Sequence, residues 1–275
     1  SVLNTGVEVD LNGVILKGND LLWTANLNLT HYKNKILSLS PELEALGGQK
    51  GSVFIRKVGG SLANAYLREY AGVDPSTGEA RYYNDPDNGD YSYATSYNAA
   101  TRTDLGDLLP KLYGGFGTRL EFKGFDFSAM FSYQLGGRIY DDGYAAFMHT
   151  GSGSRVGTNW HKDILNAWTP ENTNTNIPRL SAGDNVTNSA SSRFLISSDY
   201  LSINNLTLGY TLPKNWLRNI GLQAARVYLA CDNLAVLSAR KGLDPRYSYG
   251  ASGSNGASSD YPAMRTVTAG VQVTF

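Results

Sequence analysis

The chain has 275 residues, with 24 Lys and Arg against 24 Asp and Glu, so its formal net charge is zero. This balance argues against nucleic acid as the main partner, because phosphate binding needs an excess of clustered positive charge. No apolar run approaches the roughly 20 residues of a membrane-spanning helix, which excludes a helical membrane protein but not one that crosses with alternating strands.

Period-two alternation of apolar and polar residues dominates the chain and predicts an all-β protein. It is clear from Trp23 to Leu29, from Phe125 to Leu135, and in the last segment, from Val267 to Phe275. About nine antiparallel strands are predicted, each near the ~10 residues of a tilted membrane strand: 2–12, 20–36, 49–57, 62–72, 112–123, 125–139, 199–212, 224–237 and 264–275. The third and fourth are the weakest of them.

The alternation changes phase once, at Asn204–Asn205. Leu201 is an odd apolar position before this point, whereas Leu206 and Leu208 are even apolar positions after it. A β-bulge accommodates one extra residue of this kind, so a bulge is expected here.

The connections between the predicted strands differ in length according to the end of the sheet at which they lie. If every strand reverses direction, the connections 13–19, 58–61, 124 and 213–223 lie at one end and are mostly short. Those at the other end are mostly long: 37–48, 73–111, 140–198 and 238–263. Short turns at one end and long loops at the other are typical of outer-membrane β-barrels.

The long loops are rich in aromatic residues, which could stack on sugar rings and donate hydrogen bonds through their polar tips. We expect ligand-binding side chains among them, with loop–loop packing as the alternative for any single residue. The candidates are Tyr82, Tyr83, Tyr91, Tyr93, Trp160, Tyr247 and Tyr249. In the loop 140–198, Asp141 could cap a helix that runs through Met148, and 161–168 could form a second helix.

Enzyme chemistry finds little support. The three histidines, His31, His149 and His161, show no metal-ligand spacing, and no nucleophile motif is present. We therefore predict no catalytic residues, no metal site and no cofactor. The segment Asp85–Asp90 hints at a calcium loop, but its fifth position is Gly89 and no glutamate closes it, so a solvated turn is favoured.

Several segments resemble SusC/RagA-like TonB-dependent transporters of the outer membrane. The most specific are Tyr200–Pro213 (YLSINNLTLGYTLP) and Ala225–Leu234 (ARVYLACDNL). Further segments that are similar to the family are Asn4–Val9, Ala71–Glu79, Tyr113–Gly117, Lys123–Asp126, Gly242–Pro245 and Pro262–Arg265. They span nearly the whole chain, and Phe275 on an alternating strand resembles the signal read by the barrel-assembly machinery.

The resemblance implies an antiparallel transmembrane barrel of 22 strands with an N-terminal plug, in which residues 1–275 would supply about the last nine strands. The plug domain and the segment that contacts TonB would lie outside this chain, in a Gram-negative outer membrane of the Bacteroidetes type. The implied activity is import of oligosaccharides or peptides. The implied partners are the remaining barrel and plug, a SusD-like lipoprotein lid, the TonB complex, lipid and lipopolysaccharide.

Residues opposite the apolar strand positions, such as Glu8, Asp10, Glu121, Asp126 and Gln134, would face the lumen of this barrel. An odd number of strands cannot close with every neighbour antiparallel, so either the first and last strands pair with further chain or the count of nine is wrong by one. Two alternatives remain open. One is a soluble β-sandwich that binds carbohydrate, with its apolar faces buried between two sheets; the other is a small outer-membrane enzyme.

Overall fold

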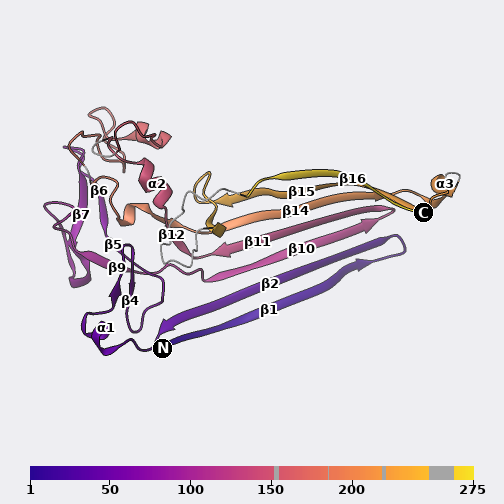
Figure 1. Ribbon diagram of the computed structural model, residues 1–275, viewed down its shortest axis with the longest axis horizontal. Coiled ribbons are helices and arrows are strands. Elements are labelled where there is room, and N and C mark those ends of the chain that lie inside the picture. Colours follow the sequence, from indigo (N-terminus) through magenta and orange to yellow (C-terminus); the bar gives the residue numbers. More distant parts are fainter. Residues whose placement is uncertain (152–154, 185, 219–220, 248–262) are drawn as a thin grey trace.

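The computed structural model describes residues 1–151, 155–184, 186–218, 221–247 and 263–275. Its main feature is a long antiparallel sheet of seven strands, ordered β1-β2-β10-β11-β14-β15-β16 (Figure 1). The strands are β1 (Val2–Lys17), β2 (Leu21–Ile36), β10 (Leu112–Phe122), β11 (Phe125–Leu135), β14 (Tyr200–Thr211), β15 (Ala224–Ser238) and β16 (Thr266–Thr274). The strands lie side by side in the sheet in the same order in which they follow one another along the chain, as in an up-and-down barrel wall.

The strand register aligns the apolar positions of all seven strands on one face. Across the middle of the sheet, Ala25 pairs with Thr118, Thr118 with Ala129, and Ala129 with Leu206. The row continues through Cys231 and Val267. We call this side the apolar face and the opposite side the polar face. The predicted bulge is confirmed, because the register of β14 shifts between Ile203 and Asn205 against β15.

The connections confirm the predicted asymmetry and correct two of the predicted strands. Residues 18–20, 123–124 and 212–223 connect strands at one end of the sheet, and 37–111, 136–199 and 239–265 connect them at the other. The predicted strands 49–57 and 62–72 do not join the long sheet. They contain only the short strands β3 (Gln49–Lys50), β4 (Phe54–Arg56), β5 (Asn64–Arg68) and the start of β6 (Tyr70–Val73).

The physical reason is visible in the burial of these short strands. Ile55 is 4% exposed, Ala65 0% and Leu67 1%, so their apolar side chains pack in a protein interior. Strands of three to five residues are also too short to cross a bilayer, which takes about 9–11 residues. Alternation alone does not distinguish a side chain that contacts protein from one that faces lipid.

The long connections fold together into a separate layer, which we call the cap (Figure 1). One cap sheet has the order β3-β4-β5-β9 and another the order β6-β7-β8. Their remaining strands are β7 (Ala80–Asp85), β8 (Asp90–Tyr93) and β9 (Arg102–Asp107), and β12 (Arg138–Tyr140) pairs with β13 (Leu195–Ser197). The short helices are α1 (Pro41–Ala45), α2 (Asp142–Phe147) and, at the other end of the sheet, α3 (Lys214–Leu217).

The helix predicted after Asp141 is confirmed as α2, because the Asp141 side chain accepts a hydrogen bond from the Tyr144 N–H at 2.9 Å. The second predicted helix is a shorter 3-10 helix, Lys162–Asn166. Among the residues that the structure describes, no helix has both the length and the apolar character needed to cross a membrane.

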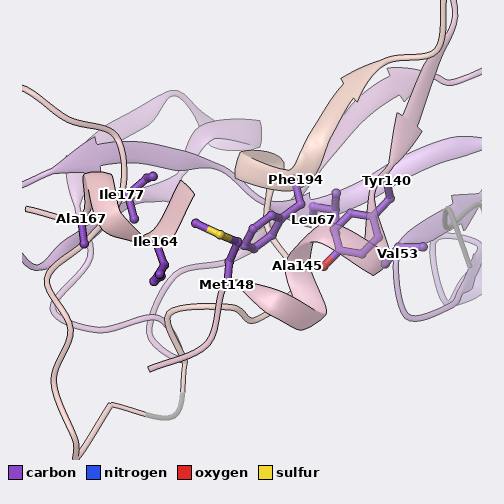
Figure 2. Packing of buried hydrophobic residues seen from close by; sticks show 9 residues of the cluster. All are labelled: Val53, Leu67, Tyr140, Ala145, Met148, Ile164, Ala167, Ile177 and Phe194. Atoms are coloured by element: carbon purple, nitrogen blue, oxygen red, sulfur yellow. The ribbon is translucent and has the colours of Figure 1, made fainter. Parts of the chain in front are cut away.

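The hydrophobic core lies in the cap (Figure 2). Phe194 is fully buried, and Figure 2 shows its ring between Met148 and the pair Leu67 and Tyr140. The other buried members are Val53, Ala145, Ile164, Ala167 and Ile177. The cap therefore holds itself together through its own interior, independently of the apolar face of the long sheet.

Candidate functional site

The apolar face remains uncovered by the described parts of the chain. Its large side chains stay exposed across every strand, with values of 64% for Val7, 54% for Phe125, 51% for Leu229 and 64% for Val267. Monomeric soluble proteins rarely expose an apolar patch larger than a few hundred Å². A face of this extent requires an apolar medium or another protein surface against it.

The polar face carries amides, hydroxyls and carboxylates at the positions between the apolar residues. The predicted inward residues Glu8, Asp10, Glu121, Asp126 and Gln134 all lie on this face by register. Asn205 donates to Asp232 at 2.7 Å, and Thr207 donates to Asn205 at 3.0 Å. A hydrogen-bonding wall of this kind suits contact with water and polar solutes.

An ion pair on the polar face joins two strands that are not neighbours. Arg226 on β15 donates from Nε to the Asp126 carboxylate on β11 at 2.7 Å and from Nη2 at 2.5 Å. Strand β14 lies between them and places Gly209 under the pair. A Cβ on Gly209 would lie 2.3 Å from Arg226 Nη2 and 2.4 Å from Asp126 Oδ2, so the pair exists only because this residue has no side chain.

Replacing Gly209 tests this arrangement. Gly209→Val is expected to separate Asp126 from Arg226 and to destabilise the folded sheet by about 1–3 kcal/mol, the usual cost of overpacking. The thermal unfolding midpoint of the full-length protein in detergent measures the effect. Gly13→Val is the matched control, because nothing lies within 4 Å of a Cβ at Gly13. Equal midpoints for the two variants would contradict the argument.

Three of the predicted ligand-binding tyrosines gather on the β7–β8 hairpin of the cap. The rings of Tyr83 and Tyr91 meet edge to face at 5.3 Å, and those of Tyr83 and Tyr93 stack at 6.1 Å. Tyr91 is 59% exposed and Tyr93 55% exposed. We call Tyr83, Tyr91 and Tyr93 the tyrosine cluster.

A charged pair borders the tyrosine cluster. The Arg81 guanidinium lies over the Tyr93 ring at 4.7 Å and pairs with the Asp74 carboxylate at 2.5 Å. Hydrogen bonds from the Ser76 hydroxyl and N–H, together with Arg81, hold the pKa of Asp74 well below its usual range. Asp74 therefore stays ionised at neutral pH and keeps Arg81 against the ring.

The other predicted ligand residues are placed elsewhere. The prediction that Tyr82 binds ligand is wrong. Tyr82 is only 2% exposed and its ring packs between Tyr70 and Tyr97, so it offers no surface to a ligand. Trp160 is half exposed, but it lies in another connection than the tyrosine cluster, 136–199, where its indole N–H donates to His149. Tyr247 ends a 3-10 helix, and Tyr249 lies outside the described residues.

The segment Asp85–Asp90 forms a closed turn around the 3-10 helix Pro86–Asn88. The carboxylate of Asp85 accepts from Asn88 at 2.7 Å, and that of Asp90 accepts from Asn84 at 2.6 Å. Among the described residues, no group of three or more His, Cys, Asp or Glu side chains is placed to hold a metal ion. Local hydrogen bonds thus explain the carboxylates of this turn.

Two ion pairs near the junction of the cap and the sheet were not predicted from the sequence. Asp141, which is fully buried, pairs at 2.6 Å with Arg240, two residues beyond the end of β15. Arg246 pairs with Asp244 at 2.6 Å and donates to Ser202 on β14 at 2.8 Å. These partners lie up to 99 residues apart, and only Asp141 carried a local signal, that of a helix cap.

Comparison with known proteins found no family model that matches the chain. TonB-dependent receptor P3 of Formosa agariphila is 28% identical over 295 residues, covering 99% of this chain and 28% of the relative. TonB-dependent receptor SusC of Bacteroides thetaiotaomicron is 24% identical over 293 residues, covering 100% of this chain and 26% of the relative. The chain thus spans less than a third of the length of these curated relatives.

Solved structures give the same relationship. The RagAB peptide transporter matches with a TM-score of 0.80 and 29% identity, covering 100% of this chain and 29% of that chain. The RagAB peptide importer in its closed-closed state matches with a TM-score of 0.80 and 28% identity, covering 100% of this chain and 30% of that chain. The similarity therefore includes the cap as well as the sheet.

Proposed function

Because this chain resembles SusC/RagA-like TonB-dependent transporters of the outer membrane over its whole length, we propose that it forms part of an active nutrient importer. The chain is an outer-membrane protein like these relatives. Within the importer, residues 1–275 form the C-terminal portion of the barrel wall and part of its outer surface. The transported nutrient is an oligosaccharide or a peptide, and catalysis is not part of the proposal.

The observation that carries the proposal is the apolar face. The seven strands of the long sheet align their apolar side chains in continuous rows that the described chain leaves uncovered. The polar face of the same strands carries the hydrogen-bonding groups. A bilayer supplies the apolar medium that such a face needs, and the polar face then lines the passage. The alternative, a soluble β-sandwich, requires a second sheet over this face, and the described residues provide none.

The proposal gives the sheet an orientation. The short connections are periplasmic turns, and the cap is extracellular, with the long loops at about 73–111, 140–198 and 238–263. The edge strands β1 and β16 pair with the remaining barrel of the same transporter, because an unpaired strand edge in lipid costs several kcal/mol for each unsatisfied group. A plug domain closes the lumen and receives energy from the TonB complex.

A SusD-like lipoprotein is the proposed lid over the cap. Phe275, which is 81% exposed, remains the proposed signal for the barrel-assembly machinery. The tyrosine cluster, together with Trp160 and the region of Tyr247 and Tyr249, is the proposed ligand-contacting surface of the cap. Tyr82 is excluded from that surface because it is buried.

The tyrosine cluster can be tested directly. The double variant Tyr91→Ala/Tyr93→Ala is expected to raise the substrate concentration for half-maximal uptake by roughly tenfold, because each lost aromatic contact is worth about 0.5–1.5 kcal/mol. Uptake by cells that carry the full-length transporter measures it. Leu46→Ala is the matched control, since Leu46 is an exposed apolar cap residue outside the cluster. An unchanged concentration dependence would remove the tyrosines from the site.

The function itself is tested with the full-length gene in its own host. Deletion should abolish growth on either a peptide mixture or a mixture of oligosaccharides as the limiting nutrient, while growth on free amino acids and monosaccharides continues. Complementation with the intact gene should restore it, and a strain without TonB should reproduce the defect. Normal growth of the deletion strain on both mixtures, or recovery of the polypeptide from buffer without detergent, would contradict the proposal.

A further inference from the structure

A pocket lies on the polar face of the long sheet, next to the cap. Its lining comes from neighbouring strands and from the end of the connection that leads into β10. The residues are Tyr32 on β2, Tyr113 on β10, Gln134 on β11, and Leu109 and Pro110 just before β10. The cavity measures about 360 Å³, within the range of about 300–1,000 Å³ that is usual for pockets that bind small ligands.

The pocket begins where the contact between the cap and β2 ends. Asn34 and Ile36 are buried residues of β2 that bond to the cap. Asn34 accepts from the Leu62 N–H at 2.8 Å, and the Ile36 N–H donates to Gly60 at 2.8 Å. Tyr32 is the next residue of β2 on the same face, two positions nearer the middle of the sheet. A solute that passes the cap and moves along the polar face therefore reaches this pocket first on β2.

The two tyrosine rings of the pocket form a corner. Tyr113 lies on the polar face because it pairs with Gln134, and Tyr32 lies there because it has the same phase as Thr30, the partner of Tyr113 on β2. The rings of Tyr32 and Tyr113 meet edge to face, with their centroids 5.9 Å apart and an angle of 85° between their planes. Tyr113 is 39% exposed, so part of its ring remains accessible to a ligand.

A glycine and a fixed amide shape the rest of the pocket. Gly115 is the next residue of β10 on the same face as Tyr113, so no side chain fills the space beside that ring. Gln134 is 7% exposed, and its Nε2 donates to the Ser198 carbonyl at 3.0 Å and to the Ser198 hydroxyl at 2.9 Å. This wall of the pocket is therefore in place before a ligand arrives, which reduces the entropy lost on binding.

The chemistry of the lining favours a neutral ligand with an apolar face. None of the five described residues that line the pocket is charged, so the charged terminus of a peptide would lose its water here without gaining an ion pair. A sugar ring has C–H faces that stack on a tyrosine ring, and its hydroxyls can bond to phenol and amide groups. The Thr30 hydroxyl group, which belongs to the residue opposite Tyr113, adds a further polar group at this place.

We propose that Tyr32 and Tyr113 stack against one neutral sugar ring of the transported oligosaccharide, in a subsite on the wall between the cap and the passage. This inference rests on the proposed function, because it requires the polar face to line the passage. It selects the oligosaccharide from the two classes of nutrient. It also places a ligand contact on the wall, separate from the tyrosine cluster of the cap.

The test measures binding by calorimetry to the full-length transporter purified in detergent. The probes are neutral oligosaccharides of glucose, galactose, mannose, fructose or xylose, with uncharged, end-blocked peptides as the second arm. The wild type should bind at least one of the oligosaccharides and none of the peptides. Tyr32→Ala/Tyr113→Ala should weaken that binding by about tenfold or more, because two aromatic contacts are lost. Tyr32→Phe/Tyr113→Phe should weaken it by less than about threefold, because both rings remain.

Tyr228→Ala is the matched control and should bind like the wild type. Tyr228 lies on the polar face of β15 beside Gly209, near the end of the sheet with the short connections. Tyr113→Ala alone removes only a partly exposed ring and serves if the double variant does not fold; it should weaken binding by at least about threefold.

Equal affinity of the wild type and Tyr113→Ala for the bound oligosaccharide would overturn the inference. So would an equal loss in Tyr228→Ala, or a wild type that binds the peptides or none of the oligosaccharides. The proposed function is refuted by a different result, which is normal growth of the deletion strain on both nutrient mixtures, so the two failures are distinguishable.

Discussion

Val271→Arg is expected to prevent most of the full-length protein from reaching its folded state in the outer membrane. Val271 lies near the middle of β16 on the apolar face, opposite Val227, and is 69% exposed to whatever covers that face. An arginine at the midplane of a bilayer costs a barrel about 2–4 kcal/mol. The amount of folded protein, which migrates differently from unfolded protein when it is not heated, measures the result.

A residue on the polar face of the same strand provides the control. Thr268 lies on the same strand but on the polar face, opposite Ala230. Thr268→Arg should leave folding and membrane insertion close to wild type, because the new side chain enters water. If both variants fold equally well, the apolar face does not contact hydrocarbon, and the soluble β-sandwich becomes the better explanation of the sheet.

Phe194→Ala is expected to unfold the cap without removing the wall from the membrane. Phe194 is 0% exposed, and its ring meets that of Tyr140 edge to face at 6.3 Å. A buried Phe replaced by Ala typically costs 3–5 kcal/mol, which is a large share of the stability of a small packed layer. Protease added to intact cells should cleave the cap of the variant much faster than that of the wild type.

Leu165→Ala is the matched control for this second prediction, because Leu165 belongs to the same part of the cap but is 86% exposed. Its cleavage rate should match the wild type, and both variants should be inserted in the membrane at wild-type levels. If Phe194→Ala instead loses the folded barrel along with the cap, the two layers are not stabilised independently.

Independent stability of the wall and the cap would bear on the proposed function. The wall is held by backbone pairing between long strands, and only a bilayer or further chain completes it. The cap is held by its own core and is joined to the wall through contacts such as the hydrogen bond from Arg246 to Ser202 on β14. Surface residues of the cap, including the tyrosine cluster, can therefore vary without affecting barrel assembly.

The sequence by itself determined the long strands, their two faces and the sorting of loop lengths. These properties are local, because side chains alternate with a period of two and a phase slip such as that at Asn204–Asn205 marks its own bulge. The resemblance to SusC/RagA-like TonB-dependent transporters then supplied the proposed function. The weak segments 49–57 and 62–72 misled the strand count, because a short strand buried in the cap shows the same alternation as one that faces lipid.

Only the tertiary structure decided which distant residues meet. Asp126 and Arg226 lie 100 residues apart and are brought together by the registers of β11, β14 and β15, with Gly209 making room between them. The same holds for burial in the cap, where Tyr82 is enclosed while Tyr83, its neighbour in sequence, joins an exposed cluster. Register and packing sum many weak contacts over the whole chain, and no local pattern of residues carries that sum.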